Sequence, residues 1–274
     1  MRVGVLGATG RMGWATCRAI LAADDLELAV AVAGQESAGH ELRELVPEAP
    51  VGLQVQASPQ DLVDAKVEVV VDFSVPEATL AAARLLLPAG VHLVSGTTGL
   101  SASGMEELRE HAAAEGNGNA VWAPNFALGA VLAQRFAAIA ARYYQAVEVI
   151  ELHHAGKADA PSGTAMRTAQ AIAAARAGMR GGQGALDPGQ PAARYREVVT
   201  GVRGGEVEGV RVHSVRLPGL VAHQEVIFGG QGEVLTLRHD SLDRSSFMPA
   251  VLLSVRAVPN RPGLTVGLEP LLDL

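Results

Sequence analysis

The chain has 274 residues, of which 49% are hydrophobic and 19% charged, and its formal net charge is −7. This length allows two modest domains, each with a substantial hydrophobic core. The 22 Lys and Arg residues are outnumbered by 29 Asp and Glu residues, which argues against a general nucleic-acid binder, because phosphate contacts need a basic face. We therefore expect no nucleic acid among the partners.

Cys17 is the only cysteine, so no intramolecular disulfide is expected. The chain begins "MRVGVLGATG", without the charged and apolar blocks of a signal peptide. No apolar run approaches the roughly 18 residues that a membrane span requires. We expect a cytoplasmic protein that does not insert into membranes.

Short apolar runs alternate with helical stretches in the first third of the chain. Strands are predicted at Arg2–Leu6, Leu26–Val32, "VEVVVDFS" and "VHLVSGTTG", with a helix from about Arg11. The strands are continuously apolar, as in a sheet covered by helices on both faces. This rhythm predicts an α/β fold whose N-terminal domain is a Rossmann-like, doubly wound parallel sheet.

The character of the chain changes after "AVWAPNF". An alanine-rich helix is predicted to about Tyr144, followed by the strand "AVEVIEL" and a glycine-rich loop at Gly178–Pro191. Three further strand-like runs mix polar and apolar residues, as in an open mixed or antiparallel sheet with one wet face. We expect a dinucleotide-binding domain at 1–126, rejoined by 241–274, and a smaller α+β domain at 127–240. The apolar helix at about Arg244–Val255 has no place in the second sheet and is expected to return to the first domain.

Gly7, Gly10 and Gly13 follow the first strand and open the first helix. The spacing G-x-x-G-x-x-G is related to the dinucleotide fingerprint, in which glycines let the backbone approach a pyrophosphate at a helix N-terminus. A glycine-rich connection without a ligand is the alternative. Arg11, inside the turn, is placed either to reach a phosphate or to lie in solvent.

The fingerprint also expects an acidic residue near the end of the second strand, where it binds the adenosine ribose. Ala33 and Gly34 stand there, and Glu36 comes only later. Without a carboxylate to repel a 2′-phosphate, we expect NADPH to be tolerated, so the cofactor is NADH, NADPH or both. A strong kinetic preference for NADH would contradict this expectation.

Two polar motifs, "DFSVPE" (Asp72–Glu77) and "SGTTG" (Ser95–Gly99), stand at the ends of predicted strands. Ser74 and Pro76 in the first motif fit a helix start. Ligands bind at the carboxyl edge of open parallel sheets. The two motifs together therefore indicate a cleft for nucleotide and substrate at that edge.

The stretch "ELHHAGKADAPSGTA" at 151–165 gathers His153, His154, Lys157 and Asp159 just before a predicted helix start at Ser162 or Gly163. Histidine and lysine suit proton transfer, and free amides at a helix N-terminus bind anions. Packing histidines and a plain N-cap at Ser162 are the alternatives. We expect no metal site, because no third ligand has suitable spacing.

Taken in order, several motifs resemble the dihydrodipicolinate reductase family, which reduces 4-hydroxy-tetrahydrodipicolinate in lysine and diaminopimelate biosynthesis. They are "GATGRMG", "DFSVPE", "SGTTG", "APNFALG", "ELHHAGKADAPSGTA", "HSVRLPGLVAHQEVIFGG" and a C-terminal "GE.L.L.H....R..F". The resemblance implies a homotetramer in which the 127–240 domain binds the substrate, a small cyclic dicarboxylate, and mediates tetramerisation.

The resemblance also implies roles for residues that match the family motifs. His153 and Lys157 would be catalytic, and His154, Lys157, Ser162, Gly163 and Thr164 would bind substrate. The cofactor would contact three segments: Gly7, Ala8, Thr9, Gly10, Arg11, Met12 and Gly13; Gly96, Thr97 and Thr98; and Ala123, Pro124, Asn125 and Phe126. Family members often carry an acid where Ala33 and Gly34 stand here.

Two other functions are compatible with parts of the chain. One is a different two-domain nicotinamide oxidoreductase that acts on another small carboxylate, which the first domain alone does not exclude. The other is a non-catalytic nucleotide-sensing protein that would bind cofactor without turnover. The 151–165 motif favours the reductase over both.

Overall fold

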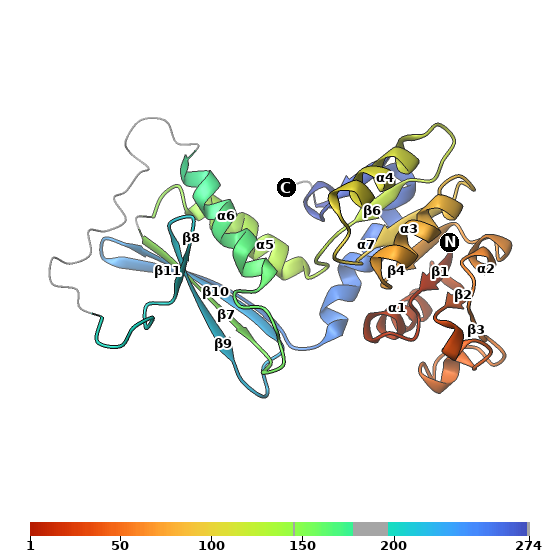
Figure 1. Ribbon diagram of the computed structural model, residues 1–274, viewed down its shortest axis with the longest axis horizontal. Coiled ribbons are helices and arrows are strands. Elements are labelled where there is room, and N and C mark those ends of the chain that lie inside the picture. Colours follow the sequence, from red (N-terminus) through yellow and green to blue (C-terminus); the bar gives the residue numbers. More distant parts are fainter. Residues whose placement is uncertain (145, 178–196, 273–274) are drawn as a thin grey trace. The chain divides into compact units, whose positions relative to one another are not determined.

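The computed structural model describes residues 1–144, 146–177 and 197–272, and these form two compact units (Figure 1). The N-terminal unit consists of Met1–Phe126 together with Arg244–Leu274, and the central unit consists of Ala127–Asp243. The loop predicted at Gly178–Pro191 lies outside the described residues.

The N-terminal unit is built on a seven-stranded parallel sheet with the strand order β12-β6-β5-β4-β1-β2-β3. Six of these strands follow the 3-2-1-4-5-6 order of dinucleotide-binding domains, in which the order reverses between β1 and β4. The strands are β1 (Arg2–Leu6), β2 (Glu27–Val32), β3 (Val55–Gln56), β4 (Val69–Asp72), β5 (His92–Ser95), β6 (Ala120–Trp122) and β12 (Leu264–Val266). The predicted Rossmann-like parallel sheet is confirmed.

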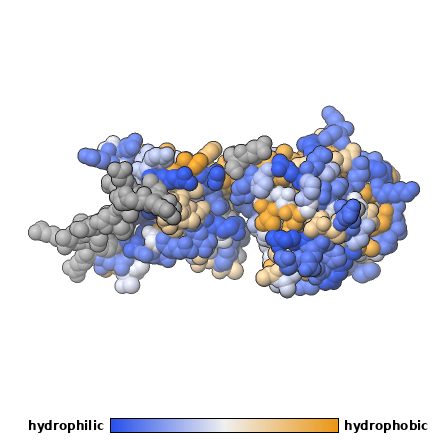
Figure 2. All heavy atoms as spheres, turned by 90° about the horizontal axis from the view of Figure 1, so that it is seen from above, coloured by the Kyte–Doolittle hydropathy of each residue, from blue (hydrophilic) through white to orange (hydrophobic). Residues whose placement is uncertain are grey.

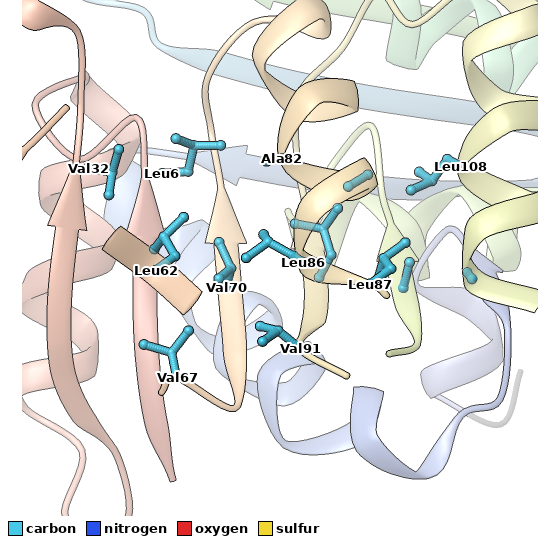
Figure 3. Close-up of a cluster of buried hydrophobic side chains, with 14 of the residues drawn as sticks. Leu6, Val32, Leu62, Val67, Val70, Ala82, Leu86, Leu87, Val91 and Leu108 are labelled. Atoms are coloured by element: carbon cyan, nitrogen blue, oxygen red, sulfur yellow. The ribbon is translucent and has the colours of Figure 1, made fainter. Parts of the chain in front are cut away.

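Helices cover both faces of this sheet, as the continuously apolar strands predicted. They are α1 (Arg11–Leu21), α2 (Gln60–Asp64), α3 (Pro76–Leu86), α4 (Ala102–Ala113) and α7 (Met248–Ala257). On one face, Leu6, Val32 and Val70 of the strands pack with Leu86 of α3 and Leu108 of α4 (Figure 3). On the other, α1 contacts α7, which also contacts β4 and β5.

Short 3-10 turns complete the N-terminal unit, at Gln35–Ser37, Leu42–Glu44, Arg244–Phe247, Val258–Asn260 and Glu269–Leu271. The helix predicted at Arg244–Val255 is divided, because the turn at Arg244–Phe247 precedes α7, whose first turn contains a proline. The segment belongs to the N-terminal unit.

The central unit contains a five-stranded mixed sheet in the order β11-β10-β7-β9-β8. Its strands are β7 (Ala146–His153), β8 (Gly205–Val207), β9 (Val210–Arg216), β10 (Ala222–Gly230) and β11 (Glu233–Ser241). β7 and β9 are parallel, whereas the other pairs are antiparallel. The parallel pair arises because α6 lies between the two strands in the chain, and such a crossover returns the chain in the same direction.

Two helices, α5 (Leu128–Ala140) and α6 (Gly163–Ala177), pack on one face of this sheet (Figure 1). α5 ends at Ala140, short of the predicted end at Tyr144. Val149, Val212 and Val226 lie opposite one another on neighbouring strands and form the core under the helices.

One further row along the strands, the helix-covered face becomes polar. Glu151 pairs with Ser214 on one side and with Gln224 on the other, and Gln224 pairs with His239. Since directly paired residues share a face, the apolar core gives way to this polar row at one end of the sheet.

Hydrophilic residues cover most of the surface in view in Figure 2, and apolar groups interrupt them. Over the ranges that the structure describes, none of the helices has the length and apolar character needed to cross a membrane.

Candidate active site

The glycine turn after β1 is shaped by backbone approaches that only glycine allows. Gly7 has a φ of +79°, and a Cβ added to it would lie 2.5 Å from the carbonyl oxygen of Phe73. A Cβ on Gly13 would overlap the carbonyl oxygen of Gly7. The turn is held to β2 by the amides of Gly7 and Ala8, which donate to the Val32 carbonyl at 2.8 and 3.0 Å.

α1 starts directly after this turn, with Gly10 as an N-cap that supplies no side-chain hydrogen bond. The first amides of a helix have no acceptor within the helix and lie at the positive end of its dipole. The amides of Arg11 and Met12 are therefore available for an anion such as a pyrophosphate. The predicted residues Gly7 to Gly13 thus form one continuous turn and helix start.

Asp72, at the end of β4, is fully buried and organises the neighbouring strand ends. Its Oδ1 accepts from the hydroxyl of Ser74 at 2.5 Å and from the Ser74 amide at 3.0 Å. Its Oδ2 accepts from the hydroxyls of Thr79, Ser95 and Thr97 at 2.6, 2.7 and 2.9 Å. A single carboxylate therefore ties the loop after β4 to the loop after β5.

The helix start expected in "DFSVPE" is partly corrected. Pro76 occupies the first turn of α3, but the N-cap is Val75, without a side-chain cap bond. Ser74 is not the cap because its hydroxyl is bound to Asp72.

The other predicted cofactor segments lie at the same carboxyl edge of the sheet. A Cβ on Gly96, after β5, would overlap the ring of Phe73, so the chain passes directly over that ring. The indole of Trp122 donates to the carbonyl of Thr97 at 2.8 Å, and Phe126 packs edge-on against Phe73 at a centroid distance of 5.7 Å. The strand ends of β1, β4, β5 and β6 thus bring the three predicted segments together.

A carboxylate that the sequence spacing missed lies at the end of β2. The side chain of Glu36, in the 3-10 turn Gln35–Ser37, folds back so that its carboxylate occupies the space of a Cβ on Gly34. This is the place where dinucleotide-binding domains carry the acid that binds ribose hydroxyls. The turn brings a carboxylate to the end of β2, where Ala33 and Gly34 have no acidic side chain of their own.

These features fit a nicotinamide dinucleotide. The glycine turn exposes backbone at the point where the strand order reverses, the helix start provides amides for a pyrophosphate, and Glu36 provides an acceptor for ribose hydroxyls.

In the central unit, the opening of the 151–165 motif marks the end of β7. His153 is the last strand residue, and its side chain is 14% exposed. His154 follows outside the strand and is exposed. The strand therefore ends between the two histidines, so their side chains are not forced to opposite faces of the sheet and both can serve one pocket.

Lys157 is held close to the histidines by the turn after β7. Its amide donates to the His154 carbonyl at 3.1 Å, and its ammonium binds Asp159 Oδ1 at 2.7 Å. The hydrogen bond from Lys157 lowers the pKa of the Asp159 carboxyl. Asp159 thus positions the ammonium of Lys157.

α6 begins at Gly163, as predicted. The Ser162 hydroxyl accepts from the Ala165 amide at 3.2 Å, and Ser162 is buried, so this side chain caps the helix. The exposed Gly163 and half-buried Thr164 follow in the first turn. A Cβ on Gly163 would lie 3.7 Å from a guanidinium nitrogen of Arg167, which adds a cation to the helix start.

Two further residues beside His153 were not recognised from the sequence. Glu151, with a side chain 1% exposed, contacts His153 Nδ1 through Oε2 at 2.5 Å. Arg216, at the end of β9, donates to both oxygens of Glu151 at 2.7 and 2.9 Å. Burial lowers the pKa of His153, and the neighbouring Glu151 carboxylate partly opposes this shift.

No group of three His, Cys, Asp or Glu side chains suited to hold a metal ion is found among the described residues. The chemistry available is that of a nucleotide-binding parallel sheet and of a cluster that combines a proton donor with an anion-binding helix start. These are the features of a two-domain, nicotinamide-dependent oxidoreductase.

Comparison with known proteins identifies the family. Models described as dihydrodipicolinate reductase, N-terminus and C-terminus, match residues 1–126 and 129–272. Proteins named 4-hydroxy-tetrahydrodipicolinate reductase from Nocardia farcinica and Mycolicibacterium vanbaalenii are 52% and 49% identical over the whole chain, with 99% and 100% of their own lengths covered. A dipicolinate-bound dihydrodipicolinate reductase from Paenisporosarcina sp. TG-14 is 36% identical, with a TM-score of 0.81 and 98% of each chain covered.

The chain belongs to the dihydrodipicolinate reductase family of NAD(P)H-dependent oxidoreductases. The resemblance drawn from the sequence motifs is thereby confirmed. An amine dehydrogenase from Mycobacterium smegmatis, with a TM-score of 0.60 at 14% identity, shares only the fold.

Proposed function

We propose that this protein reduces 4-hydroxy-tetrahydrodipicolinate to tetrahydrodipicolinate with NADH or NADPH, a step of lysine and diaminopimelate biosynthesis. Family membership supports the reaction class. The single observation that carries the proposal on this chain is the cluster at the end of β7, where His153 and Lys157 stand beside the capped start of α6.

The substrate is a small dicarboxylate, and the central unit carries groups for both of its charges. The relative from Paenisporosarcina has dipicolinate bound, which is itself a cyclic dicarboxylate. We assign one carboxylate to the amides of Gly163 and Thr164 and the other to His154 and Lys157, with Ser162 holding the helix start in place. The Lys157 ammonium and the positive end of the α6 dipole would attract a dianion to one place on a protein whose net charge is −7.

Protonation is assigned to His153 and Lys157. The bound reduced nicotinamide would supply a hydride, and conversion of the 4-hydroxy substrate to its product also consumes one proton and releases the hydroxyl group as water. Burial lowers the pKa of His153, so its imidazolium form is a stronger acid than that of a solvent-exposed histidine. Lys157, held by Asp159, presents a second donor.

The cofactor is assigned to the N-terminal unit. The turn from Gly7 to Gly13 would hold the pyrophosphate, with Arg11 near its charge. The segments Gly96–Thr98 and Ala123–Phe126 would contact the nicotinamide half, and Glu36 would contact the adenosine ribose. The Glu36 carboxylate would repel a 2′-phosphate, so we expect NADPH to be used less efficiently than NADH. Because the side chain of Glu36 is exposed, it can turn away, so we expect NADPH still to be accepted.

The proposal also includes the role of each domain, the oligomeric state of the protein and its location in the cell. We assign 1–126 and 241–274 to cofactor binding, and 127–240 to substrate binding and assembly of a cytoplasmic homotetramer. The assembly proposal is supported by the face of the central sheet opposite Val149, on which Ile150, Leu152 and Ile227 are only half-buried. Light scattering coupled to size-exclusion chromatography tests the tetramer.

The activity is tested with the condensation product of aspartate semialdehyde and pyruvate, prepared with a coupling enzyme. We expect oxidation of NADH and NADPH that depends on this substrate. Oxidation with another small carboxylate instead would identify a different two-domain oxidoreductase. Cofactor binding without turnover on any of these substrates would identify a non-catalytic nucleotide-binding protein.

A further inference from the structure

We propose that Glu151 is a positioning residue that holds His153 in the Nδ1–H tautomer and so directs its other ring nitrogen, Nε2, to proton exchange. The proposal rests on the proton-transfer role proposed for His153. It extends that role to two residues, Glu151 and Arg216, that would act through the histidine without touching the substrate.

The first step is the contact between Glu151 and His153. Both residues lie on β7, two positions apart, so their side chains leave the same face of the sheet. Glu151 Oε2 lies 2.5 Å from His153 Nδ1, and the carboxylate is almost completely buried. A short contact between buried groups fixes the orientation of the imidazole ring more firmly than a contact in solvent would.

Second, the Glu151 carboxylate also accepts hydrogen bonds from donors other than His153. Arg216 donates to Oε1 at 2.7 Å and to Oε2 at 2.9 Å, and the Ser162 amide donates to Oε1 at 3.3 Å. The same guanidinium donates to the carbonyl of Asp159 at 2.7 Å. This bidentate pairing prevents rotation of the carboxylate and links it to the turn that carries Lys157.

The third step is the ionisation state of Glu151. Burial raises the pKa of Glu151, but the hydrogen bonds from Arg216, Ser214 and His153 outweigh it, and its pKa falls below the ordinary value. The residue is therefore a carboxylate at neutral pH and accepts hydrogen bonds without donating any. Nδ1 of His153 must then carry the proton, which assigns the tautomer of the neutral ring.

The charged groups that act on His153 come from three segments. Glu151 lies on the same strand, Arg216 on the neighbouring β9, and Lys157 in the turn after β7. The carboxylate of Glu151 favours the imidazolium form, whereas burial and the two cations oppose it. Removing the Glu151 charge therefore lowers the pKa of His153 further, in addition to releasing the tautomer.

β7 offers a matched control. Glu148 lies 2.7 Å from His213 Nε2 through Oε2 and also binds Arg203. This second set repeats the combination of glutamate, histidine and arginine on the same strand, but lies outside the 151–165 motif. Glu148→Gln therefore breaks a comparable contact without touching the proposed relay.

The tautomer is measured directly on the unliganded protein by ¹⁵N NMR with labelled histidine, and the His153 signals are assigned by their loss in His153→Ala. We expect a protonated Nδ1 and an unprotonated Nε2 in the neutral ring of the unaltered protein. We expect Glu151→Gln to alter this pattern and Glu148→Gln to preserve it. An Nε2–H tautomer in the unaltered protein would overturn the proposal, whatever the Glu151 variants show.

Kinetics provide the second measurement. General acid–base catalysis contributes about 10²–10⁴-fold, so Glu151→Gln should lower kcat by about 10²-fold, with the alkaline limb of its pH profile displaced to lower pH. NADH affinity should be unchanged, and Glu151→Asp, which keeps the charge, should recover part of kcat. Glu148→Gln should leave kcat and the pH profile unaltered.

The kinetic outcomes distinguish failure of the positioning role of Glu151 from failure of the proton-transfer role of His153. If His153→Ala lowers kcat but Glu151→Gln leaves both kcat and the pH profile unchanged, the positioning role of Glu151 is wrong and the proposed function stands. If His153→Ala itself has no effect on turnover, the proposed role of His153 fails, whatever tautomer the NMR spectra show.

Discussion

The carboxylate of Glu36 occupies the space that a Cβ on Gly34 would fill, two positions after the buried end of β2. A negative charge at this place favours two ribose hydroxyls and repels a 2′-phosphate. The sequence-based expectation that NADPH is tolerated assumed that no such carboxylate was present. Its position leads to a more specific prediction.

Replacing Glu36 by Ala should raise the ratio of kcat/KM for NADPH to that for NADH by about tenfold, equivalent to about 1.4 kcal/mol. The measurement is steady-state kinetics with both cofactors at fixed substrate. Glu44→Ala, in the following 3-10 turn, is the control and should leave the ratio unaltered. An unchanged ratio in Glu36→Ala would place the ribose contact on another residue.

Lys157→Ala and His153→Ala should each lower kcat by about 10²–10⁴-fold, the range expected for loss of a general acid or base. Both residues lie in the central unit, so NADH affinity, measured by fluorescence titration, should stay nearly constant. Normal turnover in both variants would refute the assignment of the proton donors.

Gly7→Ala should weaken NADH binding by more than about tenfold, because it places a side chain at a positive φ, a strain of about 1–3 kcal/mol, and against the Phe73 carbonyl. Gly116→Ala is a control that separates the effect of strain at a positive φ from the effect of the contact with Phe73. Gly116 has a φ of +81° but no atom within 4 Å of an added Cβ. The Gly116→Ala variant should lose thermal stability without losing NADH affinity, both measured by calorimetry. Equal NADH affinity in the Gly7→Ala and Gly116→Ala variants would contradict a role of the glycine turn in NADH binding.

Cys17, in α1, should not react with a thiol reagent in the folded protein. It is fully buried, and burial raises its pKa to about 12. Labelling should therefore proceed only as fast as the N-terminal unit opens, and NADH should slow it. Rapid labelling of the native protein would show that α1 opens readily.

The same shift predicts a dependence of stability on alkaline pH. The pKa of Cys17 in the folded protein, about 12, lies above the ordinary value of 9.0. The contribution of the protonated thiol to the free energy of unfolding is therefore complete below pH 9 and is lost as the pH rises toward 12. In urea titrations, the stability of the unaltered protein should fall relative to Cys17→Ala over this interval. A constant difference between the two proteins would contradict it.

The proximity of the three segments proposed to bind the cofactor could be predicted from the sequence, because parallel strands end at the same side of a sheet. Gly7 and Gly96 each follow an apolar strand and Asp72 ends one, so their proximity follows from the fold class alone. Glu36 was missed because a tight turn reverses the chain locally and brings a later side chain back to the strand end. Spacing along the sequence carries no signal for such a reversal.

The proton-transfer cluster was only partly predictable. The spacing of Glu151 and His153 on one strand already indicated a shared face, and that signal was overlooked. Arg216 was beyond reach, because it stands opposite His153 only through the register of the parallel pair β7 and β9. That pairing also made the central sheet more mixed than its alternating runs had indicated.

Asp72 also bears on how this chain can vary over evolution. Four hydroxyl side chains, those of Ser74, Thr79, Ser95 and Thr97, share its two oxygens. Loss of any one hydroxyl leaves a buried carboxylate with less compensation, whereas loss of the acid removes an acceptor from four hydroxyls, three of which belong to buried residues. Substitutions at these five positions should therefore be accepted together or not at all, so that two loops distant in the sequence change as one heritable unit.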